Sequence, residues 1–153
     1  MRRLAYLSSL MFAALVLIPS QVSARKHEPG AVPKLIDAIN DYRSAHSVGP
    51  LRMSASLNRS ARAWSRRLIV TDSFGHAGSI QASSRFRRLG EAIAYHHGWR
   101  LNMRRSPLGQ WRNSSGHSAL LLDPQFDFIG IGRAAGYYGS GRATFWTAQL
   151  GSF

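Results

Sequence analysis

The sequence predicts an α+β domain, with helices at its start and in its middle and a β-hairpin at its end. Apolar residues recur at helical spacing in two early segments. The strongest β-propensity of the chain lies in residues 128–132 and 143–150, which the turn-rich stretch 136–141 separates. These two late segments should therefore pair as an antiparallel hairpin.

The first 24 residues have the pattern of a secretory signal peptide. Arg2 and Arg3 precede an apolar stretch over residues 4–19, and small side chains follow up to Ala24. We expect cleavage after Ala24. An uncleaved anchor is the alternative, but the apolar stretch is short for a span of roughly 20 residues. No later segment is apolar enough to cross a bilayer, so we expect an exported protein, extracellular or periplasmic.

Composition limits how the mature domain is stabilised and what it attracts. Cleavage would leave 129 of the 153 residues, enough for one hydrophobic core and too few for two domains. We expect residues 25–32 to be a loose N-terminus and residues 33–153 to be the domain. The chain has no cysteine, so packing must stabilise it without disulfides. The net charge is +13, or +11 without the signal, and favours anionic surfaces.

The two early helices follow from capping residues and spacing. Pro33 suits the first turn of a helix that ends before Gly49. A second helix should begin at a serine cap, either Ser54 or Ser56. The apolar residues at helical spacing are Leu35, Ile39 and Tyr42 in the first helix and Leu57, Ala61, Trp64 and Leu68 in the second.

Shorter elements are predicted for the middle of the chain. They are a loop over residues 71–84, a strand over 91–95, a third helix over 106–113 and a fourth, short helix over 118–122. The loop leaves the second helix and carries His76. Ser106 followed by Pro107 is typical of a helix start. His96 and His97 should point to opposite faces at the end of the strand, which disfavours a second metal site there.

Three short motifs connect these elements to a known family. They are Phe74-Gly75-His76, Gly90-Glu91-Ala92-Ile93-Ala94 and Trp111-Arg112-Asn113-Ser114-Ser115-Gly116-His117. Together they resemble the CAP superfamily of cysteine-rich secretory proteins, antigen 5 and pathogenesis-related proteins, from about residue 34 to residue 151. The resemblance implies a three-layer α-β-α sandwich, a small antiparallel sheet covered by helices on both faces. The absence of cysteine and the two-arginine signal favour the bacterial, SCP-like extracellular branch.

The resemblance also implies a central cavity lined by His76, Glu91, Ser114 and His117. Two neutral imidazoles and a carboxylate are a suitable set of ligands for one divalent ion, zinc above all, with open positions for water or a ligand. Glu91 has an alternative role, because it could accept hydrogen bonds and orient a histidine without touching metal. Animal and plant relatives carry a second glutamate where this chain has Ser114, which disfavours any mechanism that needs two carboxylates.

We therefore expect a secreted protein that binds a ligand or a metal in this cavity and is not an enzyme. The resemblance includes lipids and sterols among the candidate ligands. The enzyme alternative is a hydrolase that uses a histidine-activated serine or a metal-bound water. Its support is weak, because the chain has no Gly-x-Ser-x-Gly elbow, no His-Glu-x-x-His pair and no cysteine nucleophile.

Arginines carry most of the positive charge and provide a second hypothesis, an adhesion-type surface for anionic glycans or envelope phosphates. The candidate residues are Arg59, Arg62, Arg66, Arg67, Arg85, Arg87 and Arg88. Basic and aromatic residues do not alternate as they do in nucleic-acid platforms, so nucleic acid is not an expected partner. Trp64, Trp111 and Trp146 should belong to the core, whereas Trp99 should be exposed.

Overall fold

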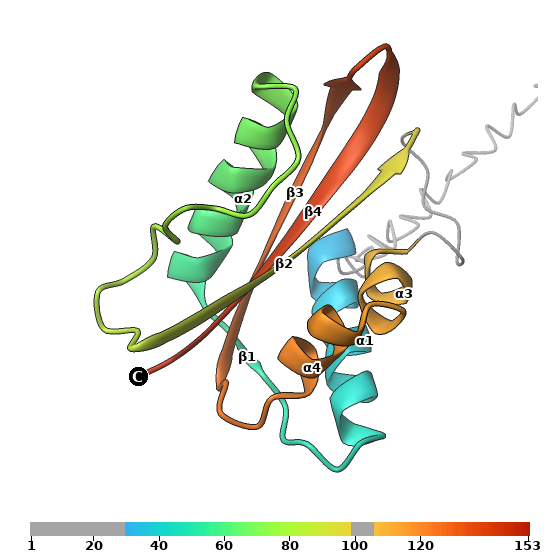
Figure 1. The fold of residues 1–153 in the computed structure, drawn as a ribbon. Helices are drawn as coiled ribbons and strands as arrows, with labels where there is room; N and C mark the ends of the chain where they lie inside the picture. Colours follow the sequence, from blue (N-terminus) through green and yellow to red (C-terminus); the bar gives the residue numbers. More distant parts are fainter. Residues whose placement is uncertain (1–29, 99–105) are drawn as a thin grey trace, which may run out of the picture.

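The computed structural model describes residues 30–98 and 106–153, which form four helices and four strands (Figure 1). In chain order they are α1 (Ala31–Ser44), β1 (Arg52–Met53), α2 (Ala55–Val70), β2 (Arg88–His97), α3 (Pro107–Arg112), α4 (Ser115–Leu122), β3 (Phe128–Tyr138) and β4 (Gly141–Ser152). The strands form one sheet in the order β1-β3-β4-β2. None of the helices in these ranges is long and apolar enough to span a bilayer.

Helices cover both faces of the sheet, as the sequence predicts. Figure 1 shows α2 on one face and α1, α3 and α4 on the other. The hairpin of β3 and β4 forms as expected, and β2 pairs antiparallel with β4 over its whole length. One strand was not predicted, because β1 is only two residues long and pairs parallel to β3. The sheet is therefore mixed and not purely antiparallel.

Several element boundaries differ from those predicted. Helix α1 begins at Ala31, so the last two residues of the stretch that we expected to be loose are helical, and Pro33 is the third helical residue. Helix α4 begins at Ser115, three residues before the predicted start. His117, which precedes the predicted helix, is consequently a helical residue. The predicted signal peptide, residues 25–29 and Trp99 lie outside the described residues.

The main core lies between the sheet and the three helices α1, α3 and α4. Trp111 and Trp146 are fully buried there, which confirms two of the three tryptophan predictions. On the other face, α2 lies so close to β3 that a Cβ atom on Gly130 would overlap the backbone of Leu57. Gly132 has the same relation to Ala61. Glycine is required at both positions because the backbones themselves are in contact.

A buried arginine that the sequence analysis missed connects the helices of the first face. Arg43 on α1 is 1% exposed, and its Nη1 donates to the carbonyl oxygens of Leu121 at 2.6 Å and Asp123 at 3.1 Å. Its Nε donates to the carbonyl of Gly49 at 2.6 Å. Burial lowers the pKa of this guanidinium, while the nearby carboxylates of Asp123 and Asp127 raise it. Arg43 thus links the end of α1 to the end of α4.

Candidate functional site

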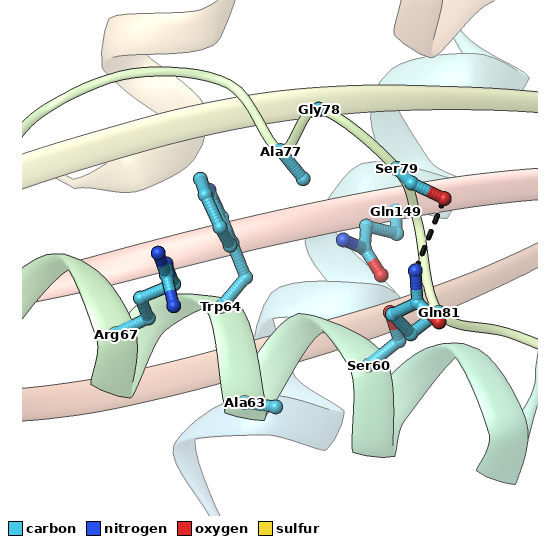
Figure 2. A pocket seen from close by; sticks show the side chains of 9 residues that line it. All are labelled: Ser60, Ala63, Trp64, Arg67, Ala77, Gly78, Ser79, Gln81 and Gln149. Atoms are coloured by element: carbon cyan, nitrogen blue, oxygen red, sulfur yellow. Dashed lines mark hydrogen bonds between the residues drawn. The ribbon is translucent and has the colours of Figure 1, made fainter.

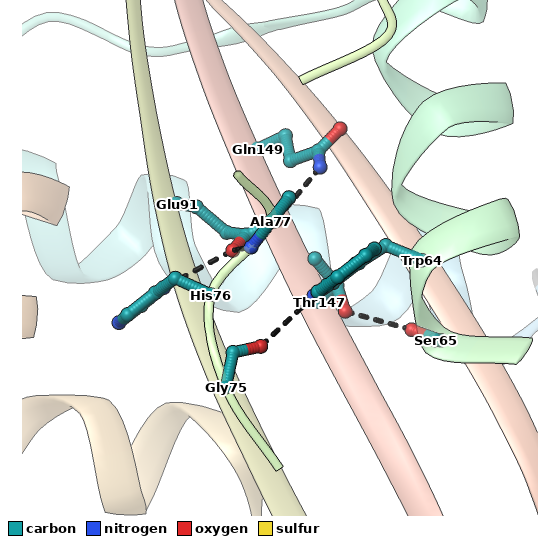
Figure 3. A network of polar contacts seen from close by, with 8 residues as sticks. All are labelled: Trp64, Ser65, Gly75, His76, Ala77, Glu91, Thr147 and Gln149. Carbon is teal, nitrogen blue, oxygen red and sulfur yellow. Dashed lines mark hydrogen bonds and ion pairs between the residues drawn. The ribbon is translucent and has the colours of Figure 1, made fainter. Parts of the chain in front are cut away.

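Glu91 is a nearly buried carboxylate on β2, opposite Gln149 of β4. Its side chain is only 5% exposed. Oε1 accepts a hydrogen bond from the backbone N–H of Ala77 at 2.9 Å and lies 3.0 Å from Nδ1 of His76. Oε2 accepts from Nε2 of Gln149 at 2.8 Å (Figure 3). Both oxygens are therefore engaged, which compensates for the loss of water around the charge.

His76 lies on the loop that leaves α2, as predicted, and its side chain is 61% exposed. A carboxylate only accepts hydrogen bonds, so in the neutral ring the proton must be on Nδ1, which faces Glu91. The lone pair is then on Nε2. This pairing of carboxylate and imidazole is the one that orients metal-binding histidines and raises their basicity.

His117, the third residue of α4, is the second imidazole of the site. The ring centroids of His76 and His117 are 6.1 Å apart, with an angle of 60° between the ring planes. Two imidazoles on one zinc ion have centroids roughly 5 Å apart, so this pair is close to a shared-ion separation. Burial, and secondarily the charge of His76, lowers the pKa of His117, which keeps its ring neutral at pH 7.

The structure thus brings His76, Glu91 and His117 together from a loop, a strand and a helix. Ser114 occupies the N-cap position of α4, but its side chain makes no capping hydrogen bond in the described structure. Within residues 30–98 and 106–153, no group of three or more histidine, cysteine, aspartate or glutamate side chains is arranged to hold a metal ion. The two imidazoles fit a divalent ion by donor chemistry, and Glu91 has the position of an orienting partner for His76.

The family follows from sequence comparison. A model of the CAP family, the cysteine-rich secretory protein family, matches residues 36–150. The chain belongs to this family. The uncharacterized protein YkwD of Bacillus subtilis (strain 168) is 29% identical over an alignment of 144 positions, which covers 86% of this chain and 49% of that protein. The chain therefore spans about half the length of the curated relative that it matches.

Solved structures show the same CAP fold. An extracellular protein containing an SCP domain from Bacillus anthracis str. Ames has a TM-score of 0.62 and 23% identity, covering 80% of this chain and 40% of that one. An outer surface protein of Borrelia burgdorferi also has a TM-score of 0.62, with 16% identity over 78% of this chain and 90% of that one. The prediction of a bacterial member of the CAP superfamily is confirmed.

Two parts of the CAP domain's site were not predicted from sequence. One is Gln149, which donates to Glu91, and the other is the position of Trp64, whose indole N–H donates to the carbonyl of Gly75 at 3.1 Å and anchors the loop that carries His76. Figure 3 shows both contacts on the side of the sheet that faces α2. The signal available in the sequence was the amide of Gln149 between the apolar residues Ala148 and Leu150, in a segment with strong β-propensity.

The seven candidate arginines of the CAP domain are all exposed. Four lie on α2, whereas Arg85, Arg87 and Arg88 lie at or just before the start of β2. Arg88 is already engaged, since its Nη2 contacts Oδ2 of Asp123 at 2.7 Å and its guanidinium lies 5.1 Å from the ring centre of Phe126. Arg67 lies 5.9 Å from the ring centre of Trp64. Of the α2 arginines, Arg59, Arg62 and Arg66 form no ion pair or ring contact within the described residues.

Proposed function

We propose that this CAP domain is an exported binding protein that holds one divalent metal ion, zinc above all, between His76 and His117. The observation that supports it is the hydrogen bond from Nδ1 of His76 to Glu91, which makes Nε2 the atom available for a metal. His117 contributes a second neutral imidazole within 6.1 Å, measured between ring centroids. When bound there, a zinc ion offers further positions to water or to a ligand.

The composition of the site favours binding over catalysis. Acid–base catalysis by a carboxylate pair is disfavoured, because this chain has Ser114 at the position where animal and plant relatives carry a second glutamate. Glu91 itself accepts hydrogen bonds from Ala77 and Gln149 as well as from His76. Those contacts hold the carboxylate in place, so its expected role is to orient His76.

Calorimetric titration with zinc tests this proposal. The native protein should bind about one ion, and the folded variant His76→Ala/His117→Ala should bind none. His46→Ala is the matched control, because His46 is exposed and contacts the carbonyl oxygen of Tyr42, outside the site. Affinity should fall at acid pH, since protons compete with the metal for the imidazole nitrogens. Equal zinc binding by native protein and double variant would exclude the site.

Glu91→Gln distinguishes an orienting role from direct ligation. The glutamine oxygen can still accept from Nδ1 of His76, but the negative charge is lost. If Glu91 orients His76, zinc affinity should fall about 10- to 100-fold, as for other partners of metal-binding histidines. Complete loss of binding in a folded Glu91→Gln protein would instead make Glu91 a direct ligand.

A second candidate function is the binding of anionic envelope polymers by α2. Arg59, Arg62 and Arg66 are exposed and form no ion pair with any residue that the structure describes. Retention on a heparin column should fall in the variant Arg59→Gln/Arg62→Gln/Arg66→Gln and should weaken as salt rises. Unchanged retention would show that the charge of α2 is incidental.

A further inference from the structure

A pocket of about 410 Å³ lies between α2 and the loop that follows it, next to the Glu91 site (Figure 2). Its lining residues are Ser60, Ala63, Trp64, Arg67, Ala77, Gly78, Ser79, Gln81 and Gln149. This volume is within the range of about 300–1,000 Å³ that is typical of small-molecule sites. Neither histidine of the proposed metal site lines it, so the pocket is distinct from that site.

Gln149 provides the pocket with a buried acceptor that lacks a donor. The side chain is 0% exposed, and its Oε1 has no hydrogen-bond partner in the part of the chain that the structure describes. The amide cannot be reversed, because Nε2 donates to Glu91 and a carboxylate has no proton to give to Oε1. Figure 2 shows the oxygen turned toward the space between Trp64 and Ser60.

An unpaired buried carbonyl is unfavourable by about 1–3 kcal/mol, so a ligand that donates a hydrogen bond to Oε1 would gain from this contact. The same side chain contacts Glu91, so the pocket lies beside the proposed metal site. Any ligand of the pocket must therefore supply a hydrogen-bond donor to Oε1 of Gln149.

The other walls of the pocket match the chemistry of a sugar. The half-buried ring of Trp64 forms one wall, and apolar C–H faces of sugar rings pack well on an aromatic surface. The hydroxyls of Ser60 and Ser79 can donate or accept, as sugar hydroxyls do. Gln81 contributes an amide that already donates to Ser79 at 3.1 Å. The guanidinium of Arg67 makes a cationic ligand unfavourable.

We propose that this pocket binds an uncharged sugar ring, which packs on Trp64 and donates a hydrogen bond to Oε1 of Gln149. The sugar site lies on the α2 side of Glu91 and requires neither His76 nor His117. Sugar binding can therefore be tested separately from metal binding.

N-acetylglucosamine is the probe, because its ring carries several hydroxyls and an amide N–H. A ¹H–¹⁵N spectrum of the native protein, recorded with a chelator, should show saturable shifts of the Trp64 indole N–H and the Gln149 side-chain amide. We expect a dissociation constant on the order of 1 mM for a single ring of this size. Glucosamine, the same ring with an ammonium group, should bind at least about 10-fold more weakly.

Two variants that each replace an exposed alanine of α2 by phenylalanine supply the structural control. Ala63 is exposed and lines the pocket, so Ala63→Phe should fill it and abolish the shifts without disturbing the core. Ala55 is exposed on the same helix but does not line the pocket, so Ala55→Phe should bind like the native protein. The variant His76→Ala/His117→Ala should also keep sugar binding while losing zinc.

The outcomes separate the alternatives. Saturable shifts that Ala63→Phe removes and Ala55→Phe keeps support the sugar site. Shifts that persist in Ala63→Phe would place the sugar elsewhere and overturn the proposal, as would the absence of saturable shifts up to about 10 times the expected dissociation constant. Equal binding of glucosamine would overturn the assignment to an uncharged ring.

Discussion

The two faces of the sheet are packed in different ways. On the face covered by α1, α3 and α4, large apolar side chains form a continuous core around Trp111 and Trp146. On the face covered by α2, the apolar cluster of Leu68, Ile93, Ala143 and Phe145 is smaller. Polar residues are also buried on that face, namely Ser60, Ser65, Thr147 and Gln149.

This difference indicates that the polar groups available for binding lie on the α2 face. The apolar face is closed by side-chain packing, and the buried guanidinium of Arg43 donates hydrogen bonds to carbonyl groups there. The α2 face is held tightly at β3 by glycine contacts, yet it is open farther along, over β4 and β2, where Glu91 and the pocket lie. A rigid contact next to a polar recess is a suitable support for a binding site.

The largest expected effect comes from breaking the close contact of α2 with β3. Gly130→Ala/Gly132→Ala places two Cβ atoms against the helix backbone, which must move away. We expect the free energy of unfolding to fall by about 4 kcal/mol, at the upper end of overpacking effects. Urea denaturation measures it. Gly49→Ala is the control, since a Cβ there has no atom within 4 Å; equal stability of double variant and native protein would contradict the contact.

On the face covered by α1, α3 and α4, replacement of the buried Arg43 should lower the stability of the protein. Arg43→Met leaves the carbonyls of Gly49, Leu121 and Asp123 without their donor. We expect a loss of about 3 kcal/mol in the free energy of unfolding. Arg59→Met, at an exposed position of α2, should change it by no more than about 0.5 kcal/mol. Similar losses in both variants would show that the buried hydrogen bonds do not set Arg43 apart.

A smaller change in stability is expected when a buried polar pair on the α2 face is replaced by apolar side chains. The hydroxyl of Ser65 donates to that of Thr147 at 2.8 Å in a buried position. Thr147→Val should cost about 1 kcal/mol because it leaves Ser65 unpaired, whereas Ser65→Ala/Thr147→Val should be nearly neutral. Thermal unfolding of both variants measures the coupling, and additive losses would exclude it.

The smallest expected effect concerns pH. A hydrogen bond from the backbone N–H of Gln125, together with Arg88, lowers the pKa of Asp123 below its ordinary value. Its stabilising contribution is therefore complete above the unfolded pKa of about 3.9 and disappears as the pH falls through the lower folded pKa. At this partly exposed ion pair it should not exceed about 1 kcal/mol. The stability difference between native protein and Asp123→Asn should shrink from pH 6 to pH 3; a constant difference would contradict this account.

Much of the fold could be predicted from local patterns. The helical spacing in α1 and α2, the Ser106-Pro107 start of α3 and the β-propensity of β3 and β4 are all properties of neighbouring residues. Three motifs were sufficient to identify the family and to select His76, Glu91 and His117. The start of α4 was missed by three residues because Ser115 and Gly116 are weak helix formers that tertiary contacts override.

What the tertiary structure added depends on contacts between residues distant in sequence. The burial of Arg43 requires carbonyls from α4, nearly 80 positions away, and β1 exists only because β3 pairs with it. Gln149 and Glu91 are 58 residues apart, so no local pattern shows that one donates to the other. The pocket likewise combines α2, a loop and β4. The spacing of apolar residues along the chain indicates which face of a helix or strand is apolar. Which polar groups form hydrogen bonds with one another is decided only by tertiary packing, because that packing brings distant residues into contact.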